Sequence, residues 1–207
     1  MGRTFAIHKP AFKNSYTITG PSRDAATTED VLFVKLRPAL NKSPFLLIYD
    51  GPDANFPVVA VSYLPPFAKH FAIGRGHAAA ADKPVPDMVW EELCMAHSSG
   101  KKHTWTMNAA GEGDCDGLRT NLVWTRTRSV TVDGMVRPPL STRNWKLTEA
   151  PSKGGRAGDE AKGSILAVFT STAQMGKCGN LQINVDHGRE FDLMVLITCL
   201  SLYSSGR

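Results

Sequence analysis

The segment REFDLMVLITCLSLY, residues 189–203, decides the fold of this 207-residue chain. It contains neither Gly nor Pro, it follows Gly188, and Ser-Ser-Gly-Arg comes after it. These features are typical of a helix of about four turns, which we expect over residues 189–204.

The predicted helix is apolar on nearly every face. Residues 193–197 form an unbroken apolar run, and only Thr198 and Ser201 interrupt the part that follows. A surface helix would keep a polar stripe, so this helix has to be surrounded on all sides. The apolar stretch 193–203 is well short of the roughly 20 residues that a membrane span needs. We therefore expect the helix to lie inside the protein, with no transmembrane segment.

Upstream of the helix, the chain has the pattern of strands and turns. Short runs rich in Val, Ile, Thr and aromatic residues alternate with clusters of Gly, Pro, Asp and Asn. In residues 15–20, for example, Tyr16 and Ile18 alternate with threonines, as expected of a strand with one buried face. The run 88–97 fits a short helix as well as a strand. Counting it, strands are predicted near residues 5–9, 15–20, 31–36, 45–49, 57–63, 69–74, 88–97, 101–107, 118–128, 143–149, 164–170 and 180–185.

Many short strands followed by one helix that is apolar all round predict an all-β fold with one helix. We expect a closed antiparallel barrel of about twelve strands around the buried C-terminal helix, because closure removes exposed sheet edges. Three loops, residues 76–87, 108–117 and 150–163, are too short to separate domains. Residues 1–207 are therefore expected to form a single domain.

Composition and charge narrow the class of protein. Hydrophobic residues make up 42% and charged residues 21% of the chain, which excludes disordered and collagen-like proteins. The first residues lack the apolar core of a secretory signal, and the four cysteines are dispersed without a C-x-x-C pair. We expect a cytoplasmic monomer in a reducing compartment, with a peripheral membrane or a nuclear location as alternatives.

Several motifs precede the terminal helix in a fixed order, namely Tyr16–Gly20, Phe45–Gly51, Pro57–Val61, Leu122–Arg126 and Ser164–Thr170. This order resembles that of the tubby C-terminal-like superfamily, which includes the tubby proteins, the plant LURP-one-related proteins and the phospholipid scramblases. The chain looks most like the compact single-domain members, over nearly its whole length. The resemblance implies a twelve-stranded barrel around a central helix and a binding module rather than an enzyme. It also implies phosphoinositide-containing membrane as a ligand, which is the best-known ligand of tubby proteins.

The candidate site comes from the charge pattern of this sequence and not from the resemblance. The formal net charge is +5, and the whole excess lies between Arg119 and Lys162. In the predicted strand 118–128, Trp124, Arg126 and Arg128 share one face by the period of two. Arg grips phosphate oxygens in a bidentate manner, and Trp prefers the membrane interface. With Arg143 and Lys146 from the next strand, these residues form a candidate site for an anionic headgroup.

A structural interpretation of the same residues stays open. They can equally form a solvated outer face of the barrel, with Arg stacked on Trp for packing. A membrane surface adds only about 1 kcal/mol for each nearby Lys or Arg.

No catalytic, cofactor or metal site is expected. The chain has no phosphate-binding loop, dinucleotide fingerprint or nucleophile elbow. His97 and His103 could face each other across a hairpin, and we interpret them as surface residues. The loop 112–117 resembles the start of a calcium loop but lacks the closing Glu, so we expect a turn, in which Cys115 is exposed. Nucleic acid is not expected as a partner, because no common recognition motif is present.

Three hypotheses follow for function. The first is a binding module for anionic phospholipid or phosphoinositide. The second is a protein-interaction or regulatory scaffold without lipid affinity. The third is a carrier or enzyme with a small ligand in the barrel lumen, against which the apolar helix argues because it would fill that lumen.

Overall fold

A computed structural model describes residues 2–22, 29–38, 43–65, 68, 70–78, 88–96, 99–108, 119–136, 143–150, 164–172 and 174–206. These residues form twelve strands and one helix. The elements are β1 (Arg3–His8), β2 (Ser15–Pro21), β3 (Glu29–Leu36), β4 (Leu46–Tyr49), β5 (Val58–Tyr63), β6 (His70–Ala78), β7 (Val89–Met95), β8 (Lys102–Asn108), β9 (Arg119–Arg126), β10 (Trp145–Glu149), β11 (Ile165–Ser171), β12 (Lys177–Ile183) and α1 (Gly188–Ser205).

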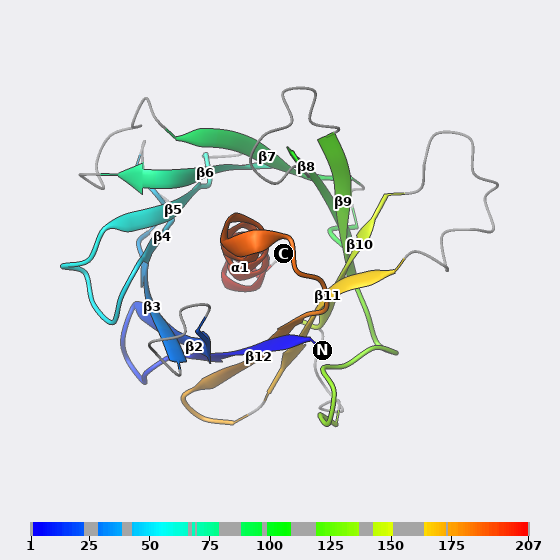
Figure 1. The fold of residues 1–207 in the computed structure, drawn as a ribbon, viewed down its shortest axis with the longest axis horizontal. Helices are drawn as coiled ribbons and strands as arrows, with labels where there is room; N and C mark the ends of the chain where they lie inside the picture. The colour runs from blue at the N-terminus through cyan, green and yellow to red at the C-terminus, as the bar shows by residue number, and fades with distance from the viewer. Residues whose placement is uncertain are drawn as a thin grey trace.

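The strands form a closed antiparallel barrel. Each strand pairs with its neighbours in the sequence, and β1 closes the ring by pairing with β12 in the register Phe5–Leu181. Figure 1 shows the ring of strands with α1 along its axis. The predicted barrel of about twelve strands around a C-terminal helix is therefore confirmed.

Alternation along the strands sends one apolar face into the lumen. Phe5 and Ile7 of β1 and Tyr16 and Ile18 of β2 are buried, whereas the residues between them are half-buried or exposed. The inward side chains pack against α1, whose residues from 191 to 202 are all buried. The expectation of a helix surrounded on all sides is confirmed. In the described part of the chain, no helix is long and apolar enough to cross a membrane.

Local details differ from the sequence prediction. The ambiguous run 88–97 contains strand β7, in which Glu91 and Leu93 are buried in alternation. Strand β9 ends at Arg126 instead of continuing to residue 128. Strand β6 continues to residue 78 and β8 to residue 108, and the rest of the predicted loops 76–87 and 108–117, together with 151–163, lies outside the described residues.

The two ends of the barrel are distinguished by which end of α1 lies there. The start of α1 lies near the start of β1, because Arg3 pairs with Asp192 at 2.7 Å. The last turn of α1 lies near the start of β2, because the hydroxyl groups of Tyr16 and Ser204 are hydrogen-bonded at 2.9 Å. We call these the helix-N end and the helix-C end. Since successive strands run in opposite directions, connections lie alternately at the two ends.

Candidate functional site

Trp124 lies inside the barrel and not on its surface. Its ring is fully buried, and its Nε1 donates a hydrogen bond of 2.9 Å to Thr198 Oγ1 on α1. Because Trp124 and Arg126 share a strand face, the side chain of Arg126 also leaves the backbone on the lumen side, at the rim of the helix-C end. The prediction that Trp124 joins a headgroup site is therefore wrong. Strand alternation correctly put these two residues together, but it did not say which face pointed inward.

Arg126 and Arg143 come together at the helix-C end. The guanidinium of Arg126 lies over the ring of Trp145, with 5.1 Å between its Cζ and the ring centroid, and that of Arg143 lies over Tyr203 at 5.3 Å. The Nε of Arg126 is buried without a hydrogen-bond partner. Burial lowers the pKa of Arg126 from its ordinary value, and the positive charge of Arg143 lowers it further. Two neighbouring cations that repel each other in this way favour an anion close by.

The other two candidate residues lie apart from this pair. Arg128 is exposed two residues beyond the end of β9, so strand alternation does not place it. Lys146 points to the outside of the barrel wall, because its neighbours Trp145 and Leu147 are buried in the lumen. The structure thus brings Arg126 and Arg143 together at one end and leaves Lys146 on the wall.

The helix-C end carries many more cations than the sequence pattern singled out. Among the described connections at this end, Asp133 is the single acidic residue, and Gln182 Nε2 holds its carboxylate at 2.7 Å on the wall. We call the following set the basic end: Lys9, Lys13, Arg37, Lys101, Arg126, Arg128, Arg143 and Lys177.

The C-terminus of α1 explains part of this accumulation of cations. A helix end carries a partial negative charge on its free carbonyl groups, and the last turn of α1 contains no basic residue. Arg143, over Tyr203 in that turn, is close enough to compensate this charge. The dipole acts only within about the last turn, so it does not account for exposed lysines on the hairpin turns.

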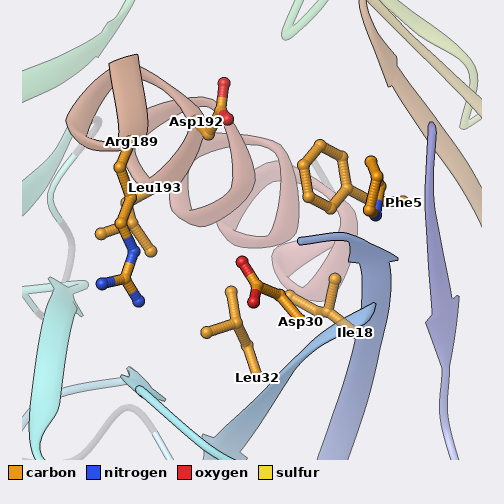
Figure 2. A pocket seen from close by; sticks show the side chains of 8 residues that line it. Phe5, Ile18, Asp30, Leu32, Arg189, Asp192 and Leu193 are labelled. Carbon is orange, nitrogen blue, oxygen red and sulfur yellow. The ribbon is translucent and has the colours of Figure 1, made fainter. Parts of the chain in front are cut away.

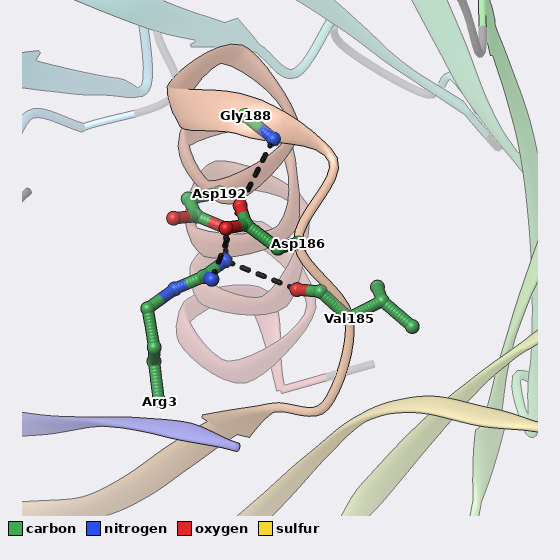
Figure 3. A network of polar contacts seen from close by, with 5 residues as sticks. All are labelled: Arg3, Val185, Asp186, Gly188 and Asp192. Atoms are coloured by element: carbon green, nitrogen blue, oxygen red, sulfur yellow. Dashed lines mark hydrogen bonds and ion pairs between the residues drawn. The ribbon is translucent and has the colours of Figure 1, made fainter. Parts of the chain in front are cut away.

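Acids and cations are paired at the helix-N end. Arg3 binds Asp192, Asp186 at 3.2 Å and the carbonyl oxygen of Val185 at 3.0 Å, as Figure 3 shows. Two further ion pairs join Arg75 to Glu190 and Arg189 to Asp50. These contacts tie the first turns of α1 to the barrel wall and place a carboxylate beside each of Arg3, Arg75 and Arg189.

Two cavities lie at the helix-N end. In the smaller one, Arg189 and Asp30 point from α1 and β3 into a space of about 20 Å³ (Figure 2), which suits one water molecule. The larger has about 330 Å³ and is lined by apolar side chains such as Val59 and Leu193 together with Arg75 and Arg189. Both arginines already bind carboxylates, so a ligand anion would have to displace Glu190 or Asp50.

The remaining candidates from the sequence are His97, His103 and the loop 112–117. His103 is buried with its ring at 5.6 Å from that of Trp145, so its interpretation as a surface residue is wrong, while His97 lies outside the described residues. Loop 112–117 with Cys115 lies outside them too. Within the described part, no group of three His, Cys, Asp or Glu side chains could hold a metal ion.

Sequence reasoning missed the lysines of the two hairpin turns, Lys9 and Lys13 after β1 and Lys177 after the β11–β12 turn. These turns lie near opposite ends of the sequence and are neighbours in space because β1 pairs with β12. The backbone N–H of Lys9 donates to the carbonyl oxygen of Gly176 at 2.9 Å. The signal that could have found Lys9 and Lys13 is the turn sequence Lys-Pro-Ala-Phe-Lys, which combines two cations with an aromatic ring.

The chain was also compared with known proteins. No family model, no curated protein and no solved structure matches it.

Proposed function

We propose that this chain is a non-enzymatic member of the tubby C-terminal-like superfamily that docks on anionic phospholipid membranes through its basic end. The observation that carries the proposal is the separation of charge along the barrel axis. Among the described residues, the cations of the basic end gather at the helix-C end, where Asp133 is the one acidic residue of the connections. At the helix-N end, Arg3, Arg75 and Arg189 are each paired with a carboxylate. An anionic membrane surface attracts such a basic end and repels acidic residues.

Several arginines suit phosphate groups at this end. A guanidinium binds phosphate oxygens in a bidentate manner, and Arg126 and Arg143 lie next to each other with one buried Nε unpartnered. Phosphoinositide headgroups combine several phosphates and would engage both arginines. The lumen itself supports the proposal less directly: side chains of α1 fill it, which argues against a ligand carrier.

Sedimentation with liposomes tests this function. We expect binding to phosphatidylcholine vesicles that contain phosphatidylserine or phosphoinositide, no binding to pure phosphatidylcholine, and loss of binding at raised salt. Arg128→Glu and Lys13→Glu, both at exposed positions, are each expected to weaken binding about tenfold, since each reverses one charge near the surface.

Lys146→Glu is the matched control, because it changes the net charge equally but lies on the outer wall. It should weaken binding much less than Arg128→Glu. Equal affinity of the Arg128→Glu variant and the wild type would contradict the basic end as the docking surface. Absence of binding to every vesicle would contradict lipid docking and favour a protein-interaction scaffold.

A further inference from the structure

Two hairpin turns at the basic end expose large apolar side chains at their tips. Phe12, in the turn after β1, is fully exposed, and Met175, in the turn between β11 and β12, is 94% exposed. With Val136, they are the most exposed large apolar residues in the described part of the chain. The hydrogen bond from Lys9 N to Gly176 O at 2.9 Å holds the two turns side by side.

The backbone at Phe12 is unusual for a side chain of this size. Its φ is +61°, the single positive φ of a residue other than Gly in the described part. The N–H of Lys13 donates to the carbonyl oxygen of Pro10 at 3.3 Å, so Phe12 occupies the turn position that normally favours Gly or Asn. A bulky residue is a genuine outlier there. Since the ring packs on nothing, neither the turn nor the core explains Phe12.

The surroundings of the tips indicate what they contact. Lys9 and Lys13 flank Phe12, Lys177 follows the Met175 turn, and neither turn contains an acidic residue. An apolar tip within a ring of cations fits the boundary between anionic headgroups and acyl chains, where both kinds of side chain are satisfied. A protein partner would have to present acidic and apolar groups side by side, and no feature of the described residues indicates such a partner.

We infer that Phe12 and Met175 insert into an anionic bilayer, so that the barrel stands on the membrane by its helix-C end. This inference rests on the proposed function and adds the depth and the orientation of docking. Lys9, Lys13 and Lys177 then lie at headgroup level beside the inserted tips. The helix-N end, with its acidic residues Asp50 and Glu190, faces away from the membrane.

Removal of the tips tests the insertion. The double variant Phe12→Gly, Met175→Ser should bind vesicles of phosphatidylcholine and phosphatidylserine at least about tenfold more weakly than the wild type. The residual binding should be lost more readily with salt, because only electrostatic attraction remains. Thermal unfolding of Phe12→Gly should not occur at a lower temperature, because Gly relieves the positive φ. Phe56→Ser, an exposed Phe at the helix-N end, is the matched control and should bind as the wild type does.

Depth is measured with Phe12→Trp and vesicles that contain brominated acyl chains. We expect bromine to quench the fluorescence of this variant more than that of the wild type, in which Trp105, Trp124 and Trp145 are buried. The exposed Trp90 lies near the start of β7, at the helix-N end, and should be quenched equally little in both proteins. Salt-sensitive binding without extra quenching, or full binding by the double variant, would overturn the insertion while leaving the proposed function intact. Absence of wild-type binding to anionic vesicles would overturn both. If, in that case, Phe12→Gly abolished self-association in sedimentation velocity, the tips would be a protein contact.

Discussion

At the scale of single residues, Trp124 links the barrel wall to the helix. Its Nε1 has one acceptor, the hydroxyl of Thr198, which in turn donates to the carbonyl oxygen of Met194 at 2.7 Å. Both residues are fully buried, so water cannot replace this contact. Together with the hydrogen bond between Ser201 and Ser62, this contact favours one rotation of α1 within the barrel.

Thr198→Val tests this contact. Val has nearly the shape of Thr but cannot accept the hydrogen bond, so the Trp124 N–H is left buried and unpaired. We expect the free energy of unfolding to fall by about 1–3 kcal/mol in urea denaturation. In the double variant with Trp124→Phe, the two losses should not add, with a coupling of about 1 kcal/mol. Strict additivity would show that the hydrogen bond contributes nothing.

Tyr203, on the same helix, is a residue whose ionisation makes the stability of the fold depend on pH. Its ring makes an edge contact with Phe169 at 5.4 Å, under the guanidinium of Arg143. Burial is the main reason that the pKa of Tyr203 is raised from 10.0 to about 12. Burial also raises the pKa of Tyr16, against the opposing effect of its hydrogen bond with Ser204.

Stability should therefore fall at alkaline pH. The folded protein holds the Tyr203 proton more tightly than the unfolded chain does, so the stability from this group is complete below pH 10 and is lost as the pH rises through about 12. Tyr203→Phe keeps the ring contacts and removes the titration. We expect the unfolding free energy of this variant to decline less between pH 10 and 12 than that of the wild type. Parallel pH profiles for the two proteins would contradict a raised pKa at Tyr203.

At the scale of elements, the β11–β12 hairpin depends on a close backbone approach. Gly179 pairs with Ser171 across the hairpin and has a φ of +157°. A Cβ at this position would overlap the carbonyl oxygen of Thr170 and lie 2.8 Å from Ser171 Cα. A methyl group at this position cannot be accommodated by a change of side-chain rotamer, because Thr170 O and Ser171 Cα belong to the backbone. Since β12 also pairs with β1, this hairpin is needed for barrel closure.

Gly179→Ala and Gly176→Ala form a matched pair within this hairpin. Gly176 has a φ of +78° but open space around it, so its substitution adds only backbone strain, about 1 kcal/mol. Gly179→Ala should cost about 3 kcal/mol or more or prevent folding, because it forces the strands apart. Thermal and urea unfolding of both variants measure the difference. Equal losses would mean that the hairpin relaxes around the added methyl group.

At the scale of the whole molecule, the helix is the core of the barrel. Side chains from every part of the ring, such as Ile7, Ile73 and Leu147, belong to one apolar cluster with α1. Without the helix, this cluster would face a space too wide for the strand side chains alone to fill. The ion pairs of Arg3, Arg75 and Arg189 attach the helix to the wall at the helix-N end. The hydrogen bond between Tyr16 and Ser204 attaches it at the helix-C end.

A chain that ends at His187 should fail to form the barrel. Loss of α1 exposes the inward faces of all strands and leaves the guanidinium of Arg3 without Asp192. We expect no cooperative thermal transition and strong binding of a hydrophobic dye. Near-ultraviolet circular dichroism reports the packing of the buried tryptophans directly. A native spectrum from the truncated chain would contradict the role of α1 as the core.

The amino-acid sequence alone determined the class of fold, because strands, turns and the helix are recognised from patterns of neighbouring residues. A period of two between turn residues indicates strands, and an all-round apolar segment, too short for a membrane, indicates a helix inside a closed sheet. The same reasoning located a basic region that contains Arg126 and Arg143. It also put Trp124 and Arg126 on one face, since neighbouring positions in a strand have fixed relative directions.

Only the tertiary structure decided where these residues lie. Which faces of β9 and β10 point inward depends on packing against α1, which buries Trp124 of β9 and leaves Lys146 of β10 on the wall. The position of the Phe12 turn beside the Met175 turn depends on the pairing of β1 with β12, whose partners are separated by nearly the whole chain. Periodicity carries no information on such distant contacts, because closing the ring is favoured by the burial of all strands together and not by any one of them.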